Sequence, residues 1–343
     1  MTSVKILKIH KWWSSHYGMM MAFVALVVAI GPSPPPIGTL LATLGLFTLA
    51  SLGIGSFGQL LNDLADVEQD LRSGAQNLVA RRGPLVRAAI FTAALAVGII
   101  PWWWLPTTPA IAALVAAEYV LFALYSLPPI RLKDRGLLGP VADALYGYVV
   151  PNAVAVLLFA GLVGGVPGWF VAVLVAWTFL YGLEQILYHQ FCDESRDRRD
   201  GIRTFVVVRG WDGAFKFLHR VVVPLEALAF VALLVGVGRF APVIPAAFAV
   251  SVAVLFVTWS RRSLANTARL DRLPAIDGVN LVAWMAIARF VQTWLPFLAM
   301  LTLVTTHPQY LALLVPQLVL FPAPILWLRW IGLPAARRLL GPA

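Results

Sequence analysis

A series of long apolar segments, separated by short polar or Pro- and Gly-rich connections, constrains this chain more than any other feature. A helix needs about 20 mostly apolar residues to cross a bilayer. The segments that meet this need are 14–31, 38–62, 85–105, 109–127, 138–161, 168–192, 214–236, 241–260, 281–305 and 310–330. Only 12% of the residues are charged, whereas a soluble domain is about a quarter charged. We therefore expect an all-α, polytopic transmembrane bundle of about ten spans and no soluble domain.

The basic residues indicate which side of the membrane each connection faces. Every Lys and Arg except Arg239 and Arg289 falls at a terminus or in the connection after an even-numbered span. Under the positive-inside rule, these parts lie in the cytoplasm. We expect a multi-pass protein of the plasma (inner) membrane with both termini cytoplasmic. The net charge of +10 then follows from topology and not from nucleic-acid binding. Residues 1–31 have the length of a signal peptide, but no small-residue cleavage site follows them.

Acidic residues gather at the cytoplasmic ends of the second and sixth predicted spans. Asn62, Asp66 and Asp70 recur every four residues and share one helix face, as do Asp193 and Asp197. Two facing carboxylate stripes would repel each other unless a hard cation lay between them. Mg²⁺ prefers oxygen ligands and is often completed by substrate phosphates. This pattern predicts a diphosphate held through Mg²⁺. One such cluster is equally typical of a solvated loop end, but two clusters at matched depth favour a site.

Basic side chains accompany the acidic ones. The double proline after Tyr125 ends its helix, so that Arg131 and Lys133 can turn towards a phosphate. The positive-inside rule alone also accounts for both. Arg289 lies inside a predicted span, where facing lipid is costly. We expect it to face the cavity and meet a carboxylate or the substrate; snorkelling to the interface is the alternative.

Two further ionisable residues lie on the sixth span. His189 shares a stripe with Asp193 and Asp197, and it is a candidate proton acceptor. Glu184 lies deeper in the membrane, where an ionisable group suggests function. The alternatives are a His buried in the bundle and an interhelical hydrogen bond from Glu184.

The motifs Asn62-Asp63-x-x-Asp66-x-x-x-Asp70 and Asp193-x-x-x-Asp197, with Tyr125-Ser-x-Pro-Pro-x-Arg131-Leu-Lys133, resemble those of the UbiA superfamily of intramembrane prenyltransferases. Gly201-Ile-Arg-Thr204 is similar too. The resemblance implies a helical bundle around a central cavity, in which aspartates hold Mg²⁺ and a polyprenyl diphosphate. The expected metal ligands are Asn62, Asp66, Asp70, Asp193 and Asp197. The expected diphosphate-binding residues are Asn62, Asp63, Tyr125, Arg131, Lys133 and Arg289. The expected catalytic residues are Asp66, Asp70, Asp193, Asp197, Glu184 and His189.

Two features depart from that family's pattern. Its members commonly have nine spans, so residues 1–305 would form the prenyltransferase-like core of a single membrane domain, 1–343. Residues 306–343 would add a span and a cytoplasmic tail. Many members also carry an Arg-Pro pair after the first motif, where this chain has Gln76-Asn77. The acceptor therefore stays undetermined.

The expected function is Mg²⁺-dependent transfer of a polyprenyl group from an allylic diphosphate to a lipophilic acceptor in the bilayer, an aromatic lipid or quinone precursor. An intramembrane terpene cyclase would use the same aspartates and is the alternative. An ion-coupled transporter is a more remote one, because transporters place their ion sites near the membrane midplane.

Overall fold

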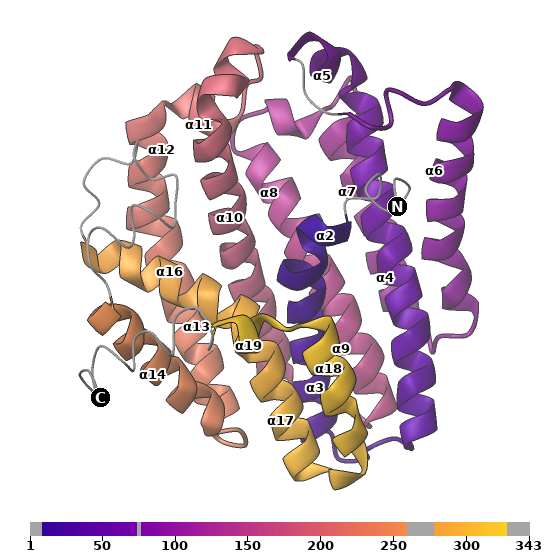
Figure 1. Cartoon of the computed structure of the whole chain (residues 1–343), viewed down its shortest axis with the longest axis vertical. Helices are drawn as coiled ribbons and strands as arrows, with labels where there is room; N and C mark the ends of the chain where they lie inside the picture. The colour runs from indigo at the N-terminus through magenta and orange to yellow at the C-terminus, as the bar shows by residue number, and fades with distance from the viewer. Residues whose placement is uncertain (1–8, 74–76, 259–277, 328–343) are drawn as a thin grey trace.

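The computed structural model describes residues 9–73, 77–258 and 278–327, which form a bundle of helices (Figure 1). The first half consists of α2 (Ile9–Trp12), the π-helix η1 (Trp13–Tyr17), α3 (Gly18–Ile30), α4 (Ile37–Ala65), α5 (Val67–Ser73), α6 (Pro84–Ile99), η2 (Ile100–Trp103), α7 (Pro109–Ser126), η3 (Leu132–Asp134), α8 (Leu138–Ala144), the π-helix η4 (Leu145–Val149) and α9 (Val150–Leu162). The second half consists of α10 (Gly168–Arg199), α11 (Phe205–Arg209), α12 (Trp211–Phe217), the π-helix η5 (Leu218–Val222), α13 (Val223–Gly238), α14 (Val243–Thr258), α16 (Gly278–Thr293), α17 (Leu295–Thr306), η6 (Pro308–Leu313), α18 (Leu314–Leu320) and α19 (Ala323–Trp327). No strand occurs in the described ranges, and the all-α prediction is confirmed.

Six helical segments are long and apolar enough to cross a membrane. They are Ile37–Ala65, Pro84–Trp103, Pro109–Ser126, Leu138–Leu162, Gly168–Arg199 and Trp211–Gly238. A seventh is added if Ala286–Thr293 and Leu295–Thr306, bent by 49° at their junction, count as one span. Ser15–Ile30, Val243–Leu255 and Pro308–Leu320 are apolar but shorter. The multi-pass architecture is confirmed, whereas the count of about ten spans stays a prediction.

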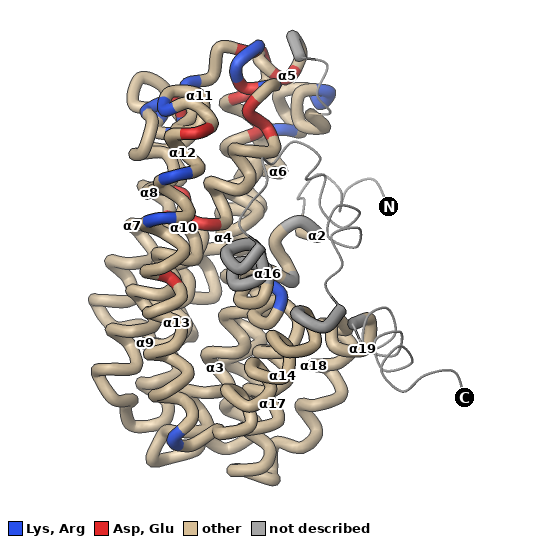
Figure 2. Tube along the Cα trace, turned by 90° about the vertical axis from the view of Figure 1, so that its left-hand side faces the viewer, with Lys and Arg blue, Asp and Glu red and all other residues tan. Residues whose placement is uncertain are grey.

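Charged residues concentrate at one end of the bundle, the end that carries α5, α11 and α12 (Figure 2). The remaining length is almost free of charge in the described part of the chain. Large apolar side chains such as Trp103, Leu228 and Val319 point outward and are exposed. An apolar outer surface of this kind is suited to lipid as its solvent.

Long helix α10 runs through the centre of the bundle. Its buried Trp177 contacts Phe23 of α3 and Phe230 of α13, with ring centroids 5.9 and 5.3 Å apart. Gly182 of α10 lets α8 approach closely, because a Cβ there would lie 2.9 Å from the Ala144 Cα. Small residues commonly allow such contacts between membrane helices. Helix α8 is therefore held firmly against α10.

The C-terminal helices pack against the N-terminal ones. Trp13 Nε1 donates to the Leu320 carbonyl at 3.2 Å, and Phe321 stacks on the Trp13 ring at 5.8 Å. Tyr310 donates a hydrogen bond to the Pro35 carbonyl. The segment predicted as one span over 310–330 is divided into η6, α18 and α19 over its described residues, with Pro322 following the end of α18. Its crossing of the membrane, and the division at residue 305, stay predictions.

Candidate active site

The first acidic motif lies where α4 ends and α5 begins. Asp66 leaves the helical conformation, with φ −102° and ψ 5°. The backbone hydrogen bonds nevertheless continue, from Asp66 N to Asn62 O at 3.0 Å and from Asp70 N to Asp66 O at 2.8 Å. The spacing of four residues therefore survives the break, and the three side chains follow one another along the chain as expected.

Asp66 is the point at which the acidic motif meets the basic segment after α7. Arg131 Nη2 donates to Asp66 Oδ1 at 2.8 Å, and Lys133 Nζ donates to Asp66 Oδ2 at 2.6 Å. Lys133 also donates to Asn62 Oδ1 at 2.9 Å. Arg131 makes a second ion pair with Asp134 at 2.6 Å. Four predicted site residues, Asn62, Asp66, Arg131 and Lys133, thus form one connected cluster, which Asp134 joins through Arg131.

The backbone at Arg131 is unusual. Its φ of 40° lies in the left-handed region, which non-Gly residues seldom occupy. Such strain persists only where surrounding contacts hold it, and it concentrates at functional sites. Here the ion pairs to Asp66 and Asp134 hold the guanidinium in place.

Asn77 supports this cluster, a role that sequence analysis missed. Its amide nitrogen donates to the Asp63 carbonyl at 2.7 Å and to Asp70 Oδ2 at 2.9 Å. Its amide oxygen accepts from the backbone nitrogens of Val79 and Ala80 at 3.0 and 2.9 Å. Asn77 therefore joins the end of α4 to the Asp70 carboxylate. Asn often accepts a hydrogen bond from the backbone two residues further on and so favours a turn. The Asn at this position is therefore the sequence signal that could have predicted the turn.

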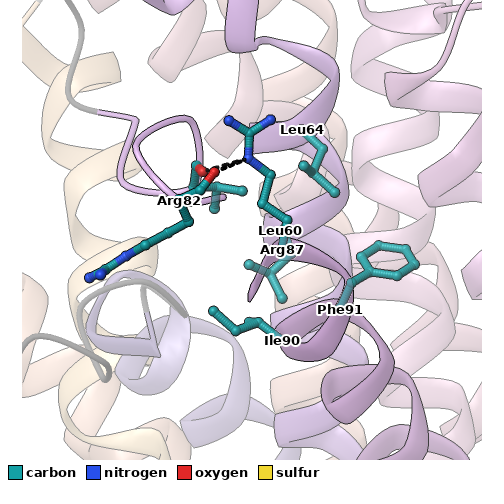
Figure 3. Close-up of a pocket in the computed structure, with 7 residues that line it drawn as sticks. Leu60, Leu64, Arg82, Arg87, Ile90 and Phe91 are labelled. Carbon is teal, nitrogen blue, oxygen red and sulfur yellow. Dashed lines mark hydrogen bonds between the residues drawn. The ribbon is translucent and has the colours of Figure 1, made fainter. Parts of the chain in front are cut away.

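Arg87 of α6 also forms hydrogen bonds with the backbone of this segment, including that of Arg82 (Figure 3). Its guanidinium donates to the carbonyls of Ala80 at 2.6 Å and Arg82 at 2.7 Å. The pocket beside it, walled by Leu60 and Phe91 among others, encloses about 10 Å³. That volume suits at most one water molecule, so this pocket is a packing detail and not a substrate site.

The second acidic motif lies at the end of α10. Asp193 accepts from Arg196 at 2.7 Å, and His189 Nε2 lies 3.4 Å from it. Asp197 is buried. The Gly136 nitrogen donates to the Arg203 carbonyl at 3.4 Å, which ties the segment after α10 to the one that carries Arg131. Both acidic motifs therefore lie at the charged end of the bundle (Figure 2).

A cavity of about 720 Å³ opens beside Asn62 and extends into the bundle. The predicted site residues that line it are Asn62, Tyr125 and His189. Other polar residues on its wall are Ser15, His16, Gln59, Glu118, Asp143, Tyr146, Gln185 and Gln292. Phe47, Phe122 and Trp102 supply aromatic surface. The cavity thus combines an aromatic wall with several polar groups.

Two predicted residues, Glu184 and Arg289, lie neither on that wall nor in the cluster at Asp66. Glu184 is fully buried and lies against Glu226 of α13, which is buried as well. Arg289 interacts electrostatically with Tyr188, which lines the cavity. Within the described residues, no three His, Cys, Asp or Glu side chains converge as a ready-made metal site.

The sequence model of the UbiA prenyltransferase family matches residues 18–275. The chain belongs to the UbiA prenyltransferase family. No curated protein matches this UbiA chain by sequence.

Solved structures of a UbiA homologue from Archaeoglobus fulgidus are similar to this UbiA protein in fold. The form bound to GPP and Mg²⁺ is 15% identical, with a TM-score of 0.55, over 87% of this chain and 98% of that one. The form bound to DMAPP and Mg²⁺ is 14% identical, with a TM-score of 0.56 and the same coverage. At this identity, the likeness concerns the fold.

Proposed function

We propose that this UbiA protein transfers a prenyl group from an allylic diphosphate to a lipophilic acceptor inside the membrane, with Mg²⁺ as cofactor. The observation that carries the proposal is the cluster of Asp66, Arg131 and Lys133 beside a 720 Å³ cavity. A charged site for the diphosphate would thereby adjoin an aromatic cavity for the chain. Membership of the family and the ligands named for the Archaeoglobus fulgidus homologue support it.

The residues at the charged end fit Mg²⁺ by their chemistry. Asn62, Asp66 and Asp70 on one side and Asp193 and Asp197 on the other offer hard oxygen donors. Mg²⁺ is commonly held by one or two carboxylates and completed by phosphate oxygens. Bound there, Mg²⁺ would neutralise charge on the diphosphate leaving group.

The basic residues of the cluster would exchange partners during binding. Arg131 and Lys133 donate to the same Asp66 carboxylate oxygens that would hold the metal ion. With the ion held there, both side chains would be free to donate to phosphate oxygens, Arg as a fork and Lys as a point charge. Tyr125, on the cavity wall and within electrostatic reach of Asp66, lies where the diphosphate and the prenyl carbon would meet.

The cavity would hold the prenyl chain and keep water away from the reacting carbon. Rings such as Phe47 and Phe122 present π faces that stabilise positive charge. Polar wall residues such as Glu118 and Asp143 favour an acceptor with hydroxyl groups over a purely hydrocarbon substrate. This observation favours transfer over the cyclase alternative. An aromatic lipid or quinone precursor has that character, and the charged end would face the cytoplasm.

The test is to incubate purified full-length protein with a panel of allylic diphosphates, Mg²⁺ and a lipid extract, and to identify the product by mass. We expect a prenylated lipid and Mg²⁺-dependent release of diphosphate, both abolished by chelation. Rapid diphosphate release without any acceptor, together with a cyclic hydrocarbon, would overturn the transfer proposal and favour a cyclase.

A further inference from the structure

Two π-helical turns meet on the cavity wall, away from the acidic motifs. The turn η1 carries His16, and η4 carries Tyr146, Gly147 and Tyr148. The His16 and Tyr148 rings contact each other with centroids 4.5 Å apart, and both residues line the cavity. π-helical turns are rare and occur frequently at functional sites. Their meeting at one place therefore identifies this part of the wall as a candidate for chemistry.

Gly147 leaves an open space between two titratable side chains. A Cβ at this position would lie 3.7 Å from His16 Nε2 and 4.0 Å from Asp143 Oδ1. The other atoms of both groups have partners: Tyr146 donates to Asp143 Oδ2, and the Ser15 hydroxyl contacts His16 Nδ1 at 2.9 Å. Asp143 Oδ1 and His16 Nε2 are consequently the atoms that face the space beside Gly147.

A line of side chains connects this place with the diphosphate site. The Tyr146 ring lies 5.2 Å from the Tyr125 ring, centroid to centroid. Tyr125 in turn interacts electrostatically with both Asp66 and Asp143. A prenyl carbon activated beside Asp66 would thus enter the part of the cavity that Asp143 and His16 line.

We propose that Asp143 and His16 form the proton-accepting end of the cavity, an inference that rests on the proposed function. The bond between the prenyl carbon and the diphosphate oxygen breaks, and its electron pair leaves with the diphosphate. The nucleophilic atom of the acceptor forms the new bond to that carbon, and the proton it carries goes to Asp143 Oδ1. Tyr146 orients this carboxylate through Oδ2, and His16 Nε2 provides the second polar contact to the acceptor.

Asp143 fits this role better than Glu184 and His189, which sequence analysis placed among the expected catalytic residues. Glu184 lies against Glu226 away from the cavity lining, whereas Asp143 is part of that lining. His189 lines the cavity but lies 3.4 Å from Asp193, at the charged end.

The test compares the wild type with Asp143→Asn. Each protein is incubated with geranylgeranyl diphosphate, Mg²⁺ and lipid extract. The measured quantity is the ratio of products formed by proton loss to the prenyl alcohol formed by water capture. We expect Asp143→Asn to lower the ratio of proton-loss product to alcohol by about 10²-fold. Binding of a thiolodiphosphate analogue and Mg²⁺-dependent diphosphate release should change far less. Asp143→Glu should recover part of the ratio.

Glu226→Gln is the matched control, because it removes a buried carboxyl of the same bundle that does not line the cavity. An unchanged product ratio in Asp143→Asn, or an equal change in Glu226→Gln, would overturn the proposal. Loss of analogue binding in Asp143→Asn would overturn it as well. Failure of the proposed function is distinguishable from failure of this proposal. A wild type that makes a hydrocarbon instead of a prenylated lipid is no transferase, but its ratio of hydrocarbon to alcohol still tests Asp143.

Gly147→Ala should lower the ratio too, because its methyl group fits in contact with both side chains and fills the space between them.

Discussion

Asp66 joins the acidic and basic parts of the site, because its carboxylate accepts from both Arg131 and Lys133. Asp66→Asn keeps the size of this side chain and removes the charge that would hold a metal ion. We expect Mg²⁺-dependent diphosphate release to fall by about 10²–10³-fold. Thermal stability should fall as well, since Lys133 is buried and loses its charged partner. Asp212→Asn, on the exposed first turn of α12, is the control and should behave like the wild type. Turnover near the wild-type value in Asp66→Asn would contradict a metal site at this position.

Lys133 gives the site a dependence on alkaline pH. Burial lowers the pKa of Lys133, and the nearby Asp66 only partly opposes this effect. Burial also acts against the charge of Arg131, but Asp134 and Asp66 outweigh it and raise the pKa of Arg131. Lys133 should therefore lose its proton at a lower pH than an ordinary Lys, while Arg131 stays charged. We expect binding of a thiolodiphosphate analogue to weaken as the pH rises through the alkaline range.

Lys133→Arg distinguishes this titration from other effects of alkaline pH, because a guanidinium keeps its charge throughout. Its analogue affinity, measured at fixed Mg²⁺ concentration, should stay level over the range in which that of the wild type declines. A parallel decline in both proteins would assign the titration to another group.

Asn77 acts on the metal site through Asp70, to which it donates at 2.9 Å. Groups that orient a metal ligand commonly contribute about 10–100-fold to metal affinity. Asn77→Ala should therefore raise the Mg²⁺ concentration needed for half-maximal turnover by about that factor. Gln317→Ala removes a buried amide from α18, which carries no site residue, and should leave the Mg²⁺ requirement unchanged. An equal Mg²⁺ requirement in both variants would refute this role of Asn77.

Hydropathy predicts where helices cross the membrane better than it predicts how they are built. The apolar run 138–161 became α8, η4 and α9, and the run 214–236 became α12, η5 and α13. A π-helical turn changes the hydrogen-bond register without changing the apolar character of the sequence, so hydropathy cannot detect it. The bend of 49° between α16 and α17 has a sequence signal in Pro296, since a proline near a helix start leaves backbone groups of the preceding turn unpaired.

Helices α4 and α6 touch through their backbones. A Cβ on Gly53 would lie 2.1 Å from the Gly98 nitrogen, so Gly53→Ala forces the two helices apart. We expect it to lower the stability of the purified protein by about 1–3 kcal/mol, measured by thermal or denaturant unfolding in detergent. Gly45→Ala is a control on the same helix, because no atom lies within 4 Å of its added methyl group. It should be neutral or slightly stabilising, by up to about 1 kcal/mol. Equal unfolding of the two variants would contradict the close crossing.

At the scale of the whole molecule, sequence predicts those features that depend on residues close together in the chain. Apolar runs gave the helical bundle, and the placement of basic residues agreed with a single charged end. The acidic and basic motifs were recognised separately, but their pairing at Asp66 depends on the packing of α4 against the segment after α7. His16 and Asp143 lie far apart in sequence, and neither belongs to a spaced motif. Their approach across Gly147 depends on tertiary packing, which no single stretch of residues encodes.

The orientation of the molecule in the membrane and its number of spans stay predictions, which reporter fusions test. Helix α10 is long enough to span the bundle, so its start, next to Gly165, lies at the end opposite the acidic motifs. If the charged end is cytoplasmic, a reporter after Arg82 reads cytoplasmic and one at Gly165 reads outside. A C-terminal reporter then depends on the segments that follow α13. It reads cytoplasmic if α14, the bent pair α16–α17 and the segment after Pro308 all cross the membrane, which is the result we expect. An outside reading would mean that at least one of these three segments does not cross, and the count of about ten spans would be wrong.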